Sequence, residues 1–279
     1  MPSLTTLAKV RAATGLTTDQ IPDADGIVII NETERNIERY LNCKFIPVTT
    51  IDIVDGTGTE EIKLRNNPVL KIRFVKTYTS VIDPEDVYVY RDSGVIKLSP
   101  DAAKTDFYAG DSKPQQVMVK YDYGLLERDM DYPVGFVSGS NLTSGSNVTV
   151  NVSTTSGISA GSYVRIYGTD GYDEVATVTS STLNTSIIVD SITVPHEKES
   201  LIEVLNVPPI AQRLATVTCS LAWMARFVGE SFDEITGYGL GELNVQKGEP
   251  WVQIREASAQ FIKERDEILS SLRQRPAIF

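Results

Sequence analysis

The sequence predicts an α+β protein with a helical bundle core, a short antiparallel β region, and an inserted all-β barrel or sandwich domain. Three observations lead to this fold class. Apolar residues recur at helical spacing in residues 23–42 and 210–228, they alternate with a period of two in residues 44–124, and residues 135–205 are dense in Ser, Thr, Gly and Asn. Each pattern predicts one part of the fold.

Two helices are expected near the N-terminus. Residues 4–13 predict a short helix that is capped by Ser3 or Thr5 and ended by Gly15. Residues 23–42 predict a second helix with one apolar stripe. The stripe consists of Ile27, Ile30, Ile37 and Leu41. This helix should therefore pack with one face inward.

About six short antiparallel strands are expected in residues 44–124. The clearest signal is VYVYRDSGVIKLS at residues 87–99, where alternating Val and Tyr lead into a polar turn that ends in Gly94. Pro68 has no N–H to donate, so it should start a strand or lie on an edge. The pattern predicts a hairpin within a small antiparallel sheet.

Residues 135–205 predict a small domain of their own. Helix formers are scarce in this segment, and strand alternation recurs in pieces such as VTVNV and YVRIYG. A disordered Ser/Thr linker is the alternative, and the alternation argues against it. The domain boundaries follow: residues 1–134 with 206–279 form one core, into which residues 135–205 are inserted.

The chain returns to helical spacing after Pro208 and Pro209. The helix predicted to about Val228 is apolar nearly all round, so it should be buried on more than one side. A glycine-rich connection over residues 232–251 then leads to a final helix that ends at Arg273. These two helices should complete the helical core.

The composition excludes several classes of partner and location. The net charge is -11 and the pI about 4.7, whereas affinity for nucleic acid comes mostly from Lys and Arg that displace counterions. Cys43 and Cys219 lie far apart without a CxxC motif, which disfavours a zinc site or disulfide framework and favours a reduced compartment. Neither a signal segment nor the roughly 20 apolar residues of a membrane span is present, so we expect a soluble chain made in the cytosol.

No catalytic, cofactor or metal site is expected, and the protein is not expected to be an enzyme. His196 is the only histidine and is predicted to be a solvated loop residue, so no Ser-His-Asp or Cys-His arrangement is expected. The segments DGTGTEE at Asp55 and GTDGYDE at Gly168 lack calcium-loop spacing. A hydrolase in the β module is a third option, disfavoured because a second histidine and a convincing carboxylate pair are missing.

The order of these signals resembles one known family. The motifs are, in chain order, Ile37–Phe45 (IERYLNCKF), Val54–Gly56 (VDG), Pro68–Val75 (PVLKIRFV), the hairpin of residues 87–99, and Val117–Gly124 (VMVKYDYG). Together they resemble the head-tail connector proteins, also called adaptor or head completion proteins, of tailed bacterial viruses. That family continues almost at once into a Pro-Pro helix, whereas here Pro208 and Pro209 follow only after the predicted insertion. The resemblance covers about residues 4–132 and 207–230.

The resemblance implies a structural virion protein. Such connectors form rings, here of about twelve copies, that dock on the portal and continue the DNA channel toward the tail. The implied partners are the portal protein, a tail-side neck or terminator protein and other copies of the chain, in the virion neck after synthesis in the host cytoplasm. Genomic DNA would pass through the lumen without tight binding, because an acidic lining repels phosphate. The alternative is a surface-binding virion module whose β insertion recognises a carbohydrate or a host surface.

Two contact sites are expected on this basis. Pro276 cannot continue the last helix, so the apolar end of the chain is expected to bind the portal. The residues of this portal-binding site are Arg273, Arg275, Pro276, Ile278 and Phe279. The hairpin is expected to contact a neighbouring subunit or the tail through Tyr88, Tyr90, Arg91 and Asp92.

Overall fold

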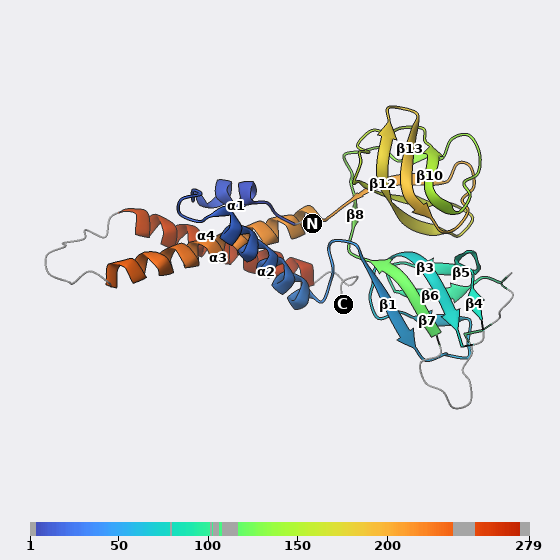
Figure 1. Cartoon of the computed structure of the whole chain (residues 1–279), viewed down its shortest axis with the longest axis horizontal. Helices are drawn as coiled ribbons and strands as arrows, with labels where there is room; N and C mark the ends of the chain where they lie inside the picture. Colours follow the sequence, from blue (N-terminus) through green and yellow to red (C-terminus); the bar gives the residue numbers. More distant parts are fainter. Residues whose placement is uncertain are drawn as a thin grey trace. The chain divides into compact units, whose positions relative to one another are not determined.

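The computed structural model describes residues 4–78, 80–100, 102, 106–107, 117–236 and 249–273. These residues form four α-helices and three antiparallel sheets (Figure 1). The chain divides into a helical unit, Met1–Phe45 with Pro208–Phe279, and a β unit, Ile46–Val207. Each unit is described by itself.

The helical unit contains the four helices. Their bounds are α1 (Leu7–Thr14), α2 (Asp23–Leu41), α3 (Pro209–Thr236) and α4 (Glu249–Arg273). Thr6 caps α1 by accepting a hydrogen bond from the Lys9 N–H, so the predicted cap at Ser3 or Thr5 is wrong. Gly15 ends α1 in the left-handed conformation, as predicted. The helix that follows Pro208 extends to Thr236, beyond the predicted end at Val228.

The core of the helical unit forms where α1 and α2 pack on α3. Trp223 is fully buried there among apolar residues of all three helices. Gly26 on α2 leaves room for the indole ring, because a Cβ at this position would lie 2.6 Å from Trp223 Cζ2. On the predicted stripe of α2, Ile30, Ile37 and Leu41 are buried, whereas Ile27 is exposed. Gly26 takes the place in the core that the apolar spacing assigns to Ile27.

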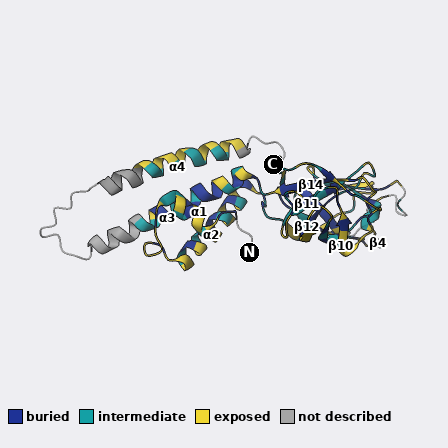
Figure 2. Cartoon of the chain, turned by 90° about the horizontal axis from the view of Figure 1, so that it is seen from above, coloured by how far each residue is buried: buried dark blue, intermediate teal, exposed yellow. Residues whose placement is uncertain are grey.

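In its described residues, helix α4 packs on α3 with fewer buried apolar side chains than α1 and α2 do. The Arg213 guanidinium binds the Glu264 carboxylate, with Nη2 2.8 Å from Oε2, and the Ser258 hydroxyl lies 3.4 Å from Met224 Sδ. Every residue from 256 to 271 is half-buried or exposed (Figure 2). The described part of α4 therefore adds little to the apolar core.

The first part of the β unit consists of two small sheets that share one apolar core. One sheet has the order β1-β7-β3-β4 and the other the order β2-β6-β5. The strand bounds are β1 (Val48–Val54), β2 (Glu61–Lys63), β3 (Val69–Thr77), β4 (Val81–Ile82), β5 (Val87–Tyr90), β6 (Val95–Leu98) and β7 (Val117–Tyr123). β5 and β6 form the predicted hairpin, with Gly94 at a φ of 67°. The short 3-10 helix η1 (Pro84–Asp86) precedes it.

The third sheet contains the Ser/Thr-rich segment and has its own apolar core. Its order is β10-β13-β12-β11-β14-β8, and β9 also pairs with β14. The strand bounds are β8 (Glu127–Arg128), β9 (Gly135–Phe136), β10 (Gly145–Asn151), β11 (Tyr163–Tyr167), β12 (Asp173–Thr182), β13 (Ser186–Ile192) and β14 (Leu201–Asn206). Strand alternation in this segment is thus confirmed, and the disordered linker is excluded for the described residues.

The predicted fold class, a helical bundle core with a short β region, is wrong. Most regular structure between residues 46 and 207 is antiparallel sheet, and these strands form a unit of their own instead of an appendage to the helices. The physical reason is a further apolar cluster, in which Leu70 and Leu126 pack against Val175 and Leu205 of the third sheet. The predicted boundaries of the insertion lie inside this β unit, and the domain assignment stays a prediction.

Replacing Gly26 with Ala tests the packing of α2 on Trp223. Ala favours a helix over Gly by about 1 kcal/mol, but overpacking a core costs about 1–3 kcal/mol. The new Cβ would lie 2.6 Å from the indole and 2.7 Å from Leu7 Cδ2, so overpacking decides the sign. We expect urea denaturation to give a free energy of unfolding lower by about 1–2 kcal/mol. In a Trp223→Phe background, which lacks the clashing ring, Gly26→Ala should lower the free energy of unfolding by less. An equal decrease in both backgrounds would contradict a clash with Trp223.

Candidate functional site

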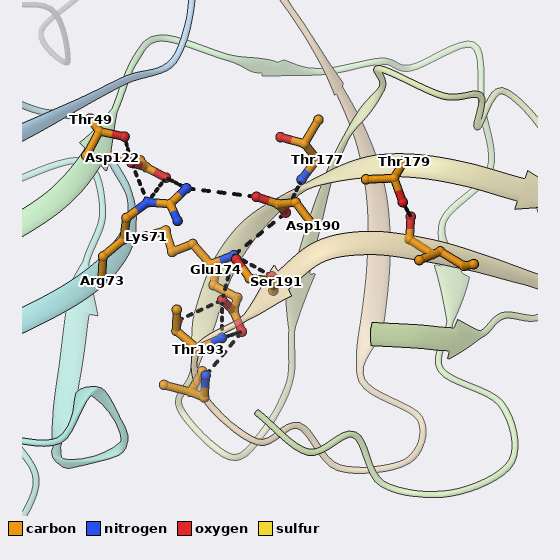
Figure 3. A network of polar contacts seen from close by, with 12 residues as sticks. Thr49, Lys71, Arg73, Asp122, Glu174, Thr177, Thr179, Asp190, Ser191 and Thr193 are labelled. Atoms are coloured by element: carbon orange, nitrogen blue, oxygen red, sulfur yellow. Dashed lines mark hydrogen bonds and ion pairs between the residues drawn. The ribbon is translucent and has the colours of Figure 1, made fainter. Parts of the chain in front are cut away.

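A buried polar network joins β3 of the first sheet to β12 and β13 of the third (Figure 3). Its centre is an ion pair between Lys71 Nζ and Glu174 Oε2, 3.5 Å apart, whose side chains are only 1% and 2% exposed. Burying two charges is costly unless each also finds hydrogen-bonding partners. The surroundings of both groups supply such partners.

Lys71 enters the core because β3 is irregular at this point. The pairing register of β3 with β7 shifts between Val69 and Lys71, and four successive residues of β3 are buried instead of alternating. The ammonium donates to the carbonyl and the hydroxyl of Ser191, the latter at 3.0 Å, in addition to its contact with Glu174. The ammonium is therefore satisfied by two hydrogen bonds and by the charge of the Glu174 carboxylate.

Glu174 is held in the charged form by its neighbours. The Thr193 N–H and hydroxyl donate to Oε2 at 3.0 and 2.8 Å, and His196 Nε2 lies 3.0 Å from Oε1. Burial alone raises the pKa of a carboxyl, but the hydrogen bond from His196 and the charge of Lys71 outweigh it, so the pKa of Glu174 is lowered. The carboxylate is thus the acceptor on which the network converges.

His196 is buried, so its prediction as a solvated loop residue is wrong. Since an ionised carboxylate only accepts, Nε2 donates to Glu174. Nδ1 lies 3.7 Å from Asp170 Oδ2 and makes no hydrogen bond with the described residues. The bridge of His196 to Leu142 and the edge-on ring of Tyr172, with centroids 6.4 Å apart, complete its enclosure. Its position fits a structural role, because no substrate reaches a ring that the fold encloses.

A more exposed set of charges surrounds the ion pair (Figure 3). Arg73 on β3 binds Asp122 on β7 through two bonds of 2.8 and 2.7 Å, and Asp122 also accepts from the Thr49 hydroxyl at 2.6 Å. The hydrogen bonding of the Arg73 guanidinium to Asp122 raises the pKa of Arg73. Asp190 on β13 lies 3.8 Å from Arg73 and accepts from the Thr177 N–H. The outer charges therefore continue the connection between the sheets, although solvent screening makes each pair weak.

The hairpin residues predicted to contact another subunit divide into two groups. Tyr88 packs on Tyr172 of the third sheet, with ring centroids 5.6 Å apart. Arg91 Nη2 donates to the Leu126 carbonyl at 3.4 Å, and burial lowers the pKa of its guanidinium. Tyr90 and Asp92 are exposed. The structure therefore brings Tyr88 and Arg91 into contacts within the chain, and contact with a second subunit stays a prediction for this group.

Most of the predicted portal-binding residues lie beyond the end of α4 at Arg273. Arg275, Pro276, Ile278 and Phe279 lie outside the described residues. Arg273 is the last residue of α4, and its side chain also lies outside the described part. This site stays a prediction.

The two cysteine thiols are buried and have raised pKa values. Burial raises the pKa of the Cys43 and Cys219 thiols to about 12, so both are inert at neutral pH. In the part of the chain that the structure describes, no His, Cys, Asp or Glu cluster has the arrangement of a metal site. No described helix combines the length and apolar character needed to cross a membrane.

None of the Lys71 network is predicted from the sequence. One signal was present, since Lys71 interrupts the apolar run PVLKIRFV, where a charge must find a partner or avoid burial. Glu174 and His196 carry no comparable local signal. Neither a protein-family model nor a curated protein matches the chain.

Substituting Glu174 with Gln tests the ion pair. The change keeps the shape of the side chain but leaves the Lys71 ammonium buried without a counter-charge, and breaking a buried pair costs about 3–5 kcal/mol. We expect urea denaturation to show a loss of this size. The matched control Glu197→Gln, at an exposed position, should stay within about 0.5 kcal/mol of the wild type. If Lys71→Met added to Glu174→Gln recovers no stability, the buried charge is not the cause of the loss.

The pH dependence of stability follows from the same carboxylate. Because the folded pKa of Glu174 is lowered, its contribution is present above the unfolded value of about 4.3 and is lost as the pH falls through the folded pKa. The free energy of unfolding should therefore decrease from about pH 5 downward. Glu174→Gln lacks this titration. The difference in the free energy of unfolding between wild type and variant, measured by urea denaturation at each pH, should therefore narrow over the same range. A difference that stays constant with pH would contradict a lowered pKa for Glu174.

Proposed function

We propose that the chain is a structural virion protein, a head-tail adaptor that forms a ring on the portal and continues the DNA channel toward the tail. The observation that carries the proposal is the packing of the family-like segments. The N-terminal helices and the Pro-Pro helix are far apart in sequence but form one helical core around Trp223. Thr5 and Thr216, from these two segments, have their hydroxyl oxygens 2.8 Å apart. An insertion between the last strand and this helix is compatible with that packing.

The burial of the polar network supports a structural role, in which the protein acts by binding other proteins. The cavity that adjoins Glu174 measures about 10 Å³, room for a single water molecule. A site for a reaction needs a hollow that admits its substrate, typically of several hundred cubic ångström. Lys71, Glu174 and His196 therefore support the fold, and the cavity beside Glu174 is too small to admit a substrate to them.

An exposed apolar edge supports assembly into a ring. β1 lies at an edge of its sheet in the described structure, and its outward residues Ile51 and Ile53 are exposed. Such an edge offers unpaired backbone groups and apolar area to another chain. The proposed partners are further copies, about twelve in a closed ring, with the portal on one side and a tail-side neck protein on the other. The net charge of -11 suits a lumen through which DNA slides without binding.

Native mass spectrometry of the purified protein tests ring formation. At concentrations of tens of micromolar we expect a closed species of about a dozen copies, confirmed as a ring by negative-stain imaging. The variant Ile51→Glu places a charge on the β1 edge opposite Lys120, where it has a favourable neighbour within the chain. This variant should remain folded and lose the ring.

The control for this experiment is Leu183→Glu, at an exposed apolar residue in the turn between β12 and β13. It should assemble as the wild type does. A wild-type protein that stays monomeric across the concentration range would contradict the proposal. If Ile51→Glu still forms rings, the β1 edge is not part of the interface between subunits.

A further inference from the structure

An exposed apolar row crosses three strands of the third sheet. Leu201 on β14 pairs directly with Phe136 on β9 and with Tyr167 on β11. Directly paired residues of a sheet project from the same face, so these side chains are neighbours. Phe136 is 44% exposed and Leu201 is 40% exposed. The row is continuous, unlike the isolated exposed Leu183 on a turn.

A hollow of about 510 Å³ adjoins this row. Tyr167 and Leu201 belong to both the row and the lining of the hollow. The other lining residues are Gly168, Thr169, Glu197, Lys198, Glu199 and Ser200. The volume lies within the range of about 300–1,000 Å³ that small-molecule sites occupy. Row and hollow together, called the Leu201 face below, combine an apolar platform with polar groups at its side.

Tyr167 is held in place before any ligand arrives. Its hydroxyl donates to Glu203 Oε1 at 2.8 Å, and the Arg165 guanidinium lies over the ring, 4.3 Å from its centroid. Arg165 is fixed in turn by two hydrogen bonds to Asp173, of 2.8 and 2.6 Å. A side chain that is already ordered costs little entropy on binding.

Ser200 supplies a polar group without a partner. The residue is 3% exposed, and its hydroxyl makes no hydrogen bond with the described residues. A Cβ on Gly168 would lie 2.8 Å from this hydroxyl. A side chain at position 168 would therefore press on this hydroxyl. Gly168 and Ser200 both line the hollow, so a small shift of Ser200 lets its hydroxyl bond to a ligand oxygen there.

We propose that the Leu201 face binds a neutral saccharide. A pyranose ring presents an apolar C–H face, which stacks on aromatic and aliphatic side chains, and hydroxyl groups, which bond to carboxylates and hydroxyls. The row matches the first requirement, and Glu197, Glu199 and Ser200 match the second. Two carboxylates against the single ammonium of Lys198 disfavour an anionic sugar. This activity goes beyond the proposed adaptor function and does not depend on ring formation.

Saturation-transfer NMR on the full chain tests the proposal. The probes are the methyl glycosides of glucose, galactose, mannose and N-acetylglucosamine, with sialic acid as the charged comparison. We expect transfer to at least one neutral glycoside, strongest at the C–H protons of one ring face. Leu201→Ala and Gly168→Ala should each weaken binding about fivefold or more, the first by removing apolar contact and the second by filling the space beside Ser200.

The matched control is Leu183→Ala, which removes an exposed leucine outside the Leu201 face. It should bind as the wild type does, and circular dichroism should show all three variants folded. Absence of transfer to every neutral glycoside would overturn the proposal, as would binding of sialic acid alone. Wild-type binding by both Leu201→Ala and Gly168→Ala would also overturn it. Loss of the ring in Ile51→Glu with saccharide binding retained would separate this site from the adaptor function.

Discussion

The ion pair between Lys71 and Glu174 is the constraint on which the β unit depends. Two charges removed from water are tolerated only in an arrangement that satisfies both, and here Ser191, Thr193 and His196 supply the remaining hydrogen bonds. A slip of β3 by one residue would turn Lys71 to the opposite face and leave Glu174 without its ammonium partner. The pair therefore selects one register and one relative position of the two sheets more than it adds net stability.

Apolar contacts contribute the larger part of the stabilisation around this pair. Leu70, next to Lys71 in sequence, packs with Leu126, Val175 and Leu205 in a cluster that both sheets share. The 3-10 helix η1 adds a further contact, since the Tyr172 hydroxyl donates to the Glu85 carbonyl at 2.8 Å. The polar network specifies the arrangement and the apolar cluster supplies its free energy, which is why the strands and the Ser/Thr-rich segment form one unit.

Elements defined by local chemistry could be predicted from the sequence. The hairpin follows from alternation and from the positive φ that Gly94 permits, and α2 follows from its apolar stripe and the left-handed end at Asn42. The assignment of strands to a unit could not be predicted, because it depends on contacts such as Lys71 with Ser191, 120 residues apart. The burial of His196 has the same cause. Its acceptor Glu174 is 22 residues away, and no local pattern marks it.

The outward face of the third sheet shows how this arrangement bears on function. At one end of β11 and β14 the paired residues Tyr163 and Leu205 are covered by the apolar cluster. At the other end Leu201 is exposed and its partner Tyr167 is half-buried. The cluster and the ion pair thus fix where the Leu201 face lies within the β unit. If the chain assembles as a closed ring, each copy repeats this face at a constant spacing. The proposed saccharide contacts would then add through effective concentration on a surface that displays many copies of the ligand.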